Sequence, residues 1–325
     1  MSIDWDKPFK TYDELIDLME TRNIIIRDRG YVKQCLSDIS YYSLINGYKD
    51  LFKCEGEKFI TPVPFDLLHL IYIIDSGLNN ILFKYIIDVE RSLKSKISYI
   101  ISKKYGVYTD ISDLSNKNQD DYLCIDNYRG TPFRNNILKQ IKKEIKDKSN
   151  EPDIAHYIIN HNHIPCWILI NNIPFGLACK LYQTMKCDDK NYVCESMISV
   201  DLPLDLKKDL LFKSLEILRE YRNKIAHGKR IFTNTINKEI PKRIVLKISK
   251  GQITNEDYLN GIGKNDLVAV ILIILSLTRG IQRNLFIPEL LKCIEPFKNL
   301  LFVDKTIYDI LNLPPNFLDG LRKTE

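Results

Sequence analysis

The sequence lacks the features that mark exported, disulfide-stabilised or membrane-spanning proteins. Its eight cysteines are scattered and none belongs to a Cys-x-x-Cys pair, so reduced thiols in a cytosol are expected rather than a disulfide framework. Residues 1–6 contain no basic region followed by an apolar one, which predicts no export signal. The longest apolar run, Leu267–Leu277, is too short to span a bilayer and predicts a fully buried helix. We therefore expect a cytoplasmic protein without a membrane partner.

Several motifs of common enzyme classes are also missing. The sequence has no glycine-rich phosphate loop ending in Lys-Ser/Thr and no Gly-x-Ser-x-Gly elbow, which argues against P-loop nucleotide hydrolysis and α/β-hydrolase chemistry. The adjacent carboxylates Asp120-Asp121 and Asp188-Asp189 diverge on any helix or strand, so they indicate turns rather than metal pairs. No cofactor is expected.

One cluster has residue types that suit zinc: His156, His161, His163 and Cys166. No second group of zinc-ligand residues at a matching spacing follows. A packed turn around Pro165-x-Trp167 accounts for the same segment. We therefore expect no metal site.

Composition predicts a globular protein with a large core. Of 325 residues, 45% are hydrophobic and 27% charged, and the net charge is +5. This mild excess permits a polyanionic partner without requiring one. Lysines recur at helical spacing in one cluster, which indicates either a solvated face or a phosphate-binding one: Lys139, Lys142, Lys143, Lys146 and Lys148.

Periodicity predicts a mainly α protein. The expected helices cover residues 11–22, 31–53, 65–104 (one helix or two), 132–148, 151–161, 174–187, 205–226 and 267–286. Residues 240–253 alternate weakly and are rich in Ile and Val, which favours a small β-hairpin. The glycine and prolines of 53–64 suggest a boundary between an N-terminal helical module (1–60) and a helical core (61–325). Polar, turn-rich residues predict a surface insertion at 107–131.

The segment Tyr221–Gly228 gathers an arginine, an amide and a histidine at a helix end. Gly228 is a plausible C-terminal cap. Arg222 falls within an apolar stripe, so its charge must be paired, lie at an interface or face a site. Asn223 and His227 are four residues apart and share a face beside that stripe, and Arg219 points nearly the same way. Arg222 could simply pair with a carboxylate at the core edge while His227 caps carbonyl groups.

Arg222-Asn223-x-x-x-His227 resembles the signature of HEPN ribonucleases, and the surrounding chain resembles the Abi-like (AbiD/AbiF) abortive-infection family of that superfamily. Further blocks agree in order over residues 7–285: Lys7-Pro8-Phe9 with Thr11–Leu15, Leu36–Tyr42 with Gly47-Tyr48, Asp88–Lys94, and Ile164–Trp167 with Phe175-Gly176. One departure is Asn171–Pro174, where the family pattern is more acidic and serine-rich. The resemblance implies a HEPN-type helical bundle acting as an endoribonuclease in phage defence or a toxin–antitoxin system.

RNA carries its own nucleophile, because its 2′-hydroxyl can attack the adjacent phosphate. An enzyme then has to supply a base, an acid and positive charge on the phosphoryl oxygens, with no metal required. One histidine cannot act at both ends of an in-line displacement at once, and this chain has only one such motif. A symmetric pair of protomers can provide one histidine on each side. The resemblance likewise implies a homodimer with a composite cleft.

These considerations assign His227 as acid or base, Arg222 as phosphate clamp and Asn223 as the orienting group. The RNA-binding candidates are Arg219, Lys224, Lys229, Arg230, Arg91 and Lys94. Relatives of the AbiF type also imply a cognate structured non-coding RNA as a partner.

Two readings from other classes stay open at this point. In the first, the protein is a non-catalytic RNA-binding module whose Arg222 and His227 grip phosphate or hold the dimer. In the second, it is a structural or interaction protein. Tyr41, Tyr42 and Tyr48 either pack in the core or stack on unpaired bases.

Overall fold

The computed structural model describes residues 7–115, 117–230 and 236–322, and most of them are helical. This confirms the predicted mainly α class. Residues 1–6, whose composition predicts no export signal, lie outside the described residues.

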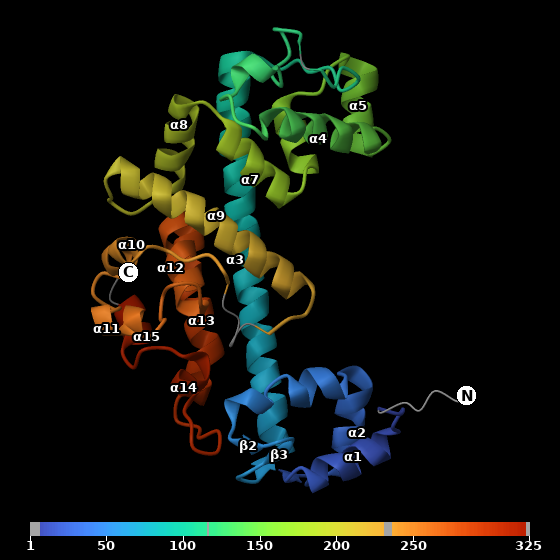
Figure 1. Cartoon of the computed structure of the whole chain (residues 1–325), viewed down its shortest axis with the longest axis vertical. Coiled ribbons are helices and arrows are strands. Elements are labelled where there is room, and N and C mark those ends of the chain that lie inside the picture. The colour runs from blue at the N-terminus through green and yellow to red at the C-terminus, as the bar shows by residue number, and fades with distance from the viewer. Residues whose placement is uncertain (1–6, 116, 231–235, 323–325) are drawn as a thin grey trace.

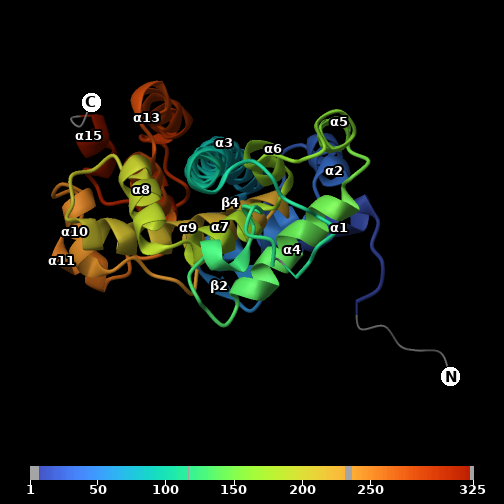
Figure 2. The ribbon, with the colours of Figure 1, turned by 90° about the horizontal axis from the view of Figure 1, so that it is seen from above.

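A single helix of 41 residues, α3 (Phe65–Tyr105), forms the spine of the molecule (Figure 1). Seen from above in Figure 2, α3 lies between two groups of helices. The elements before it are α1 (Tyr12–Thr21), β1 (Ile24–Ile25), α2 (Arg29–Asp38), a π-helical turn η1 (Tyr42–Asn46), a 3-10 turn η2 (Lys49–Leu51), β2 (Cys54–Glu55), β3 (Lys58–Phe59) and β4 (Val63–Pro64).

Helices after α3 cover its second half and its sides. They are η3 (Ile125–Asn127), α4 (Arg134–Asp147), α5 (Pro152–His161), α6 (Cys166–Leu169), η4 (Ile170–Asn172), α7 (Phe175–Thr184), α8 (Cys187–Met197) and α9 (Leu204–Ala226). The chain closes with α10 (Lys242–Ile248), α11 (Asn255–Leu259), α12 (Leu267–Leu277), α13 (Gly280–Ile294), η5 (Glu295–Phe297), α14 (Ile307–Leu311) and α15 (Phe317–Arg322).

The length and composition of α3 would also admit a membrane span, and no other helix in the described ranges meets that test. The core helix of a soluble protein meets it equally well. Helices α6, α8, α9, α12 and α13 all contact α3. A role as the central core helix therefore accounts for its apolar composition.

The N-terminal elements gather around the first turns of α3 (Figure 1). Strand β1 pairs in parallel with β4, and β2 pairs antiparallel with β3. The prediction of one helix over residues 31–53 is wrong. Helix α2 ends where Ile39 adopts an extended backbone, and the chain then forms the separate turns η1 and η2. Whether residues 1–60 form an independent module stays a prediction.

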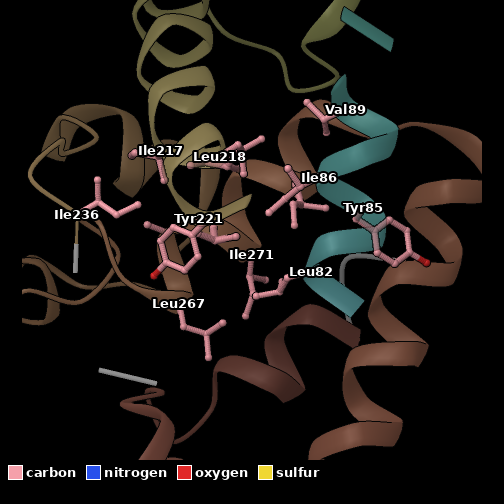
Figure 3. Close-up of a cluster of buried hydrophobic side chains, with 14 of the residues drawn as sticks. Leu82, Tyr85, Ile86, Val89, Ile217, Leu218, Tyr221, Ile236, Leu267 and Ile271 are labelled. Carbon is pink, nitrogen blue, oxygen red and sulfur yellow. The ribbon is translucent and has the colours of Figure 1, made fainter. Parts of the chain in front are cut away.

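Part of the core lies where α9 crosses α3. In Figure 3, Leu82 and Ile86 of α3 face Leu218 and Tyr221 of α9, with Ile271 of α12 beside them. All five side chains are buried. This crossing fixes the direction in which α9 runs, and therefore where the helix end with the Tyr221–Gly228 segment lies.

The predicted β-hairpin at 240–253 is wrong, because residues Lys242–Ile248 form helix α10. Ile244, Val245 and Ile248 are buried together, and their spacing places them on one helical face that packs against α12. Tertiary packing thus determined the secondary structure of a segment in which apolar and polar residues alternate only weakly.

Two other predictions differ in extent. The helix expected over 267–286 is two helices, because Thr278 adopts an extended backbone after α12 and α13 begins at Gly280. All residues of α12 are buried, as expected for the run Leu267–Leu277. Helix α8 was not anticipated as a separate element.

The segment 107–131 contains no α-helix among its described residues, yet it is not purely a surface excursion. Tyr122 and Leu123 are fully buried. Asp121 is buried as well, and its carboxylate accepts hydrogen bonds from the hydroxyl of Thr109 (2.6 Å) and the backbone N–H of Leu123 (2.7 Å) while pairing with Lys142 of α4. This buried ion pair holds the segment against α4.

Candidate functional site

Helix α9 ends in a Schellman motif that fixes the position of His227. The backbone N–H of Lys229 donates to the carbonyl oxygen of Lys224, and that of Gly228 donates to Ile225, both at 2.9 Å. Gly228 has a φ of +65°, the left-handed conformation that this motif requires. The predicted helix stop at Gly228 is confirmed. His227 is the C-cap residue, and it is exposed.

Arg222 lies at the rim of the buried face of α9 rather than within it. The buried face continues from Leu218 to Tyr221, whereas Arg222 and Ile225 are half-buried. The sequence pattern placed Arg222 in the apolar stripe at this turn, whereas the neighbouring Tyr221 takes the buried position. Burial raises the pKa of the Tyr221 hydroxyl, the nearby carboxylate of Asp266 raises it further, and the phenol stays neutral.

Within the described residues, no carboxylate pairs with the guanidinium of Arg222. Its Nη1 donates to Oδ1 of the adjacent Asn223 at 3.4 Å, and its Nε is buried without an acceptor. Among residues 7–115, 117–230 and 236–322, neither Arg222 nor Arg219 forms an ion pair. The alternative in which Arg222 pairs with a carboxylate at the core edge is therefore not what the structure shows. The charge remains available to an anion.

A hollow of about 650 Å³, here called the Arg222 hollow, lies where α9 faces the start of α7. Arg219, Arg222 and Asn223 line it from α9, and Lys143 and Lys180 line it from α4 and α7. Three carboxylates, those of Glu144, Asp147 and Glu220, line it as well. Gly176 allows the close approach of α7 to α9, because a Cβ there would lie 3.3 Å from Cδ of Arg219. The Phe175-Gly176 element of the sequence thus serves to let an arginine reach this hollow.

A second hollow of about 550 Å³, here called the His227 hollow, lies between the end of α9, η1 and the first half of α3. It is lined by Tyr42, Ser43, Gly47, Tyr48, Tyr72, Asp75, Ser76, Asn79, Asn80, Ile225, His227, Gly228, Lys229 and Arg230. The guanidinium of Arg230 lies over the ring of Tyr48, 5.6 Å from its centroid.

Tyr48 lines the His227 hollow and is also buried in the core. Its hydroxyl donates to the carboxylate of buried Asp75 at 2.9 Å. Burial and the nearby Asp75 raise the pKa of Tyr48, so its hydroxyl remains a donor. Of the three tyrosines expected either to pack in the core or to stack on bases, Tyr48 is buried, Tyr41 is partly buried, and Tyr42 is 74% exposed.

A single chain does not bring the three predicted catalytic side chains into one cavity. Arg222 and Asn223 line one hollow, and His227 lines the other. Sequence reasoning missed Tyr72 and Asn79 in the second hollow. The spacing of residues within α3 does not mark Tyr72 and Asn79 as site residues, because the hollow forms only where α9 ends beside α3.

The predicted RNA-binding residues divide into exposed and buried ones. Arg91 has a side chain 75% exposed, and Lys229 is exposed beside His227. Lys94 is not at the surface: its ammonium pairs with Glu90 at 2.7 Å and donates to the carbonyl oxygen of Ile173 at 2.8 Å. Its inclusion was wrong, since its charge neutralises a buried carboxylate. Lys224 and Arg230 are half-buried.

The lysine cluster on α4 is likewise not a uniform face, because Lys142 is fully buried. Its partner is Asp121, as described above. The exposed members of that cluster include Lys143, which reaches the Arg222 hollow.

The residues that suited zinc do not form a ligand set. His156 and His161 lie with ring centroids 5.3 Å apart, whereas Cys166 is fully buried. Burial raises the pKa of the Cys166 thiol, which disfavours the thiolate that a metal would bind. In the part of the chain that the structure describes, no three histidine, cysteine or acidic side chains gather as metal ligands would.

The chain matches the family model described as Abi-like protein over residues 34–233, from within α2 to just beyond the end of α9. The chain belongs to the Abi-like protein family. That family implies abortive-infection defence against phage, and both hollows lie largely within the matched region. No curated protein and no solved structure matches the chain.

Proposed function

We propose that this Abi-like protein is a metal-independent endoribonuclease of a phage-defence or toxin–antitoxin system. The observation that carries the proposal is the presence, at one helix end, of exposed His227 and of Arg222, whose Nε is buried without an acceptor among the described residues. An uncompensated arginine suits the phosphoryl oxygens of RNA, and an exposed imidazole suits proton transfer. The resemblance of the Arg-Asn-x-x-x-His segment to the HEPN signature supports the same assignment.

The reaction needs no group beyond RNA and these side chains. One His227 takes the proton of the 2′-hydroxyl as its oxygen attacks phosphorus. The bond from phosphorus to the 5′-oxygen breaks, and a second imidazole protonates that leaving oxygen. The products are a 2′,3′-cyclic phosphate and a 5′-hydroxyl. Arg222 stabilises the charge that develops on the phosphoryl oxygens, and Asn223, bonded to it at 3.4 Å, orients it.

The second imidazole comes from His227 of a second copy of the chain. Within one copy, Arg222 and His227 line different hollows, so one chain supplies neither two imidazoles nor a cavity that holds both groups. A symmetric pair of α9 ends would provide one imidazole on each side of the phosphate. A cognate structured RNA would bind exposed cations outside this site, such as Arg91.

Cleavage of labelled RNA in EDTA tests the proposal directly. The wild-type protein should yield 2′,3′-cyclic phosphate ends and should spare an all-deoxy substrate, which lacks the attacking hydroxyl. His227→Ala, purified in the same way, should be inactive. His161→Ala, which removes another exposed histidine on α5, should retain activity.

The second candidate is a non-catalytic RNA-binding protein, favoured by Arg219 and Arg222, which line the Arg222 hollow and form no ion pair among the described residues. It predicts that RNA shifts in a gel yet remains whole. Tight binding without cleavage, in the wild type and in His227→Ala alike, would replace the ribonuclease proposal with this one.

A further inference from the structure

Two residues that line the His227 hollow each carry a buried side-chain atom with no hydrogen-bond partner among the described residues. The two atoms are Oδ1 of Asn79, an acceptor, and Nη1 of Arg230, a donor. Both residues line the same hollow, one from α3 and the other from the chain just after α9. Buried polar atoms left without a partner cost free energy, so an acceptor and a donor without partners, on two residues that line one hollow, favour a ligand that supplies both bonds.

The same hollow has an aromatic wall. Tyr42 is 74% exposed and Tyr72 half-buried, and both line the hollow together with Asn79 and Arg230. Flat aromatic surface next to hydrogen-bonding groups is how proteins hold unpaired bases.

We propose that the His227 hollow binds an unpaired guanine of the RNA, next to the scissile phosphate. The proposal rests on the proposed action on RNA and adds a base preference to it. The guanine O6 and N7 atoms are the acceptors that arginine contacts most often, and they would take the Arg230 bond. The N1–H and N2–H groups of the same base would donate to Asn79. His227 lines this hollow, so the phosphate of the bound nucleotide lies within its reach.

The shape of the hollow depends on Gly47. A Cβ at this position would collide with the carbonyl oxygen of Ser43, and Cδ of Arg230 lies 3.6 Å from where that Cβ would be. Gly47 therefore lets η1 turn tightly, and Arg230 lies against this turn with its guanidinium over the ring of Tyr48. The π-helical turn thus forms part of the wall beside Arg230.

Binding can be measured apart from cleavage by using His227→Ala as the common background. The probes are short uridine-rich oligoribonucleotides with one central G, A, C or U, followed by fluorescence anisotropy. The G probe should bind about tenfold or more tighter than the others. Adding Asn79→Leu should remove that preference. Adding Tyr42→Ala should weaken all probes by about five- to a hundredfold.

Tyr99→Ala is the matched control, because Tyr99 is an exposed tyrosine (53%) toward the opposite end of α3. It should leave binding unchanged. Photo-crosslinking of thioguanine-containing RNA uses the unsubstituted protein, so its result does not depend on whether a variant folds. Crosslinks should map to Tyr42 or Tyr72, and crosslinks confined to other parts of the chain would overturn the proposal.

The outcomes separate this proposal from the ribonuclease itself. A guanine preference that disappears with Asn79→Leu, in a protein that never cleaves RNA, would retain the base pocket and reject the nuclease. Cleavage with equal binding of all four probes would retain the nuclease and reject the pocket. A preference for another base would reject the guanine assignment.

Discussion

The backbone N–H of Lys229 donates to the carbonyl oxygen of Lys224 at 2.9 Å, and this bond places His227 at a fixed angle on the end of α9. Because the end is closed by hydrogen bonds rather than frayed, the imidazole leaves the helix on the side of α3 and η1, whereas Arg222 faces α7. The candidate site is thus divided between two hollows by the geometry of a single helix end.

A mixing experiment tests whether two copies share one site. In an equal mixture of wild-type protein and His227→Ala, a cleft that needs an imidazole from each copy makes the hybrid dimer inactive. RNA cleavage should then fall to about a quarter of that of wild-type protein alone at the same total protein concentration. Sites that act independently would retain about half, and that result would reject the composite cleft.

Arg222→Lys keeps a positive charge but loses the planar fork that contacts two oxygens at once. We expect the RNA cleavage rate to fall by about a hundred- to a thousandfold, as for loss of a transition-state donor. Arg29→Lys is the control, since Arg29 pairs with Asp17 at 2.6 Å on the distant N-terminal elements and should tolerate the change. Unchanged cleavage by Arg222→Lys would remove Arg222 from the clamp role.

Gly228→Ala tests the helix end. Because Gly228 has a φ of +65°, a side chain there should lower the free energy of unfolding by about 1 kcal/mol. It should also reduce cleavage, since His227 would lose its fixed position. Thermal unfolding and RNA cleavage measure the two effects. Gly130→Ala, at a glycine outside the positive-φ set with open space around it, should show neither.

Asp121→Ala tests the buried ion pair that holds segment 107–131 on α4. It would leave the fully buried ammonium of Lys142 without its carboxylate, and the hydroxyl of Thr109 without an acceptor. We expect a loss of about 3–5 kcal/mol in the free energy of unfolding, measured by denaturant titration. Asp120→Ala removes the neighbouring exposed carboxylate and should be nearly neutral. Equal effects of the two variants would contradict this account.

Asp266 predicts a pH dependence of stability. It caps α12 by accepting from the N–H of Ala269 (2.9 Å) and Gly263 (3.0 Å), yet burial raises its pKa above the ordinary value of 3.8. The folded protein therefore holds this proton more tightly than the unfolded chain does. Its contribution to stability is fully present below pH 3.8 and is lost as pH rises through the folded pKa.

Asp266→Asn keeps the capping acceptor and removes the titration. Relative to wild type, its free energy of unfolding should improve as pH rises above 3.8. Denaturant titrations at a series of pH values give this difference, in which the contributions of other carboxylates cancel. A difference that is independent of pH would show that Asp266 does not titrate in this range.

Local patterns in the sequence were good guides to single elements. The end of α9 at Gly228 and the fully buried helix α12 were both predicted, because a left-handed glycine and a continuous apolar run act over a few residues. The family was also recognisable from short blocks in order, and the match over residues 34–233 confirms it. The catalytic roles of Arg222, Asn223 and His227 remain predictions.

Errors arose where a distant partner decided the outcome. Lys94 was a candidate for RNA binding, yet it is buried, pairs with Glu90 and donates to the distant carbonyl oxygen of Ile173. Lys142 was expected in a basic cluster, yet it is buried against Asp121. The second of these pairs joins segments that no helical spacing relates. Similarly, α10 formed in place of a hairpin because α12 provides an apolar surface for its buried face.

By itself, the sequence determined that this protein is helical and that an arginine, an amide and a histidine meet at the end of one helix. Hydrogen bonds within a few residues are sufficient for both. Only the tertiary structure decided that Arg222 and His227 open onto different hollows, and that Asn79 and Arg230 meet in one of them. The reason is that α3 and α9 cross through a shared apolar core, and the sequence of neither helix alone specifies that crossing (Figure 3).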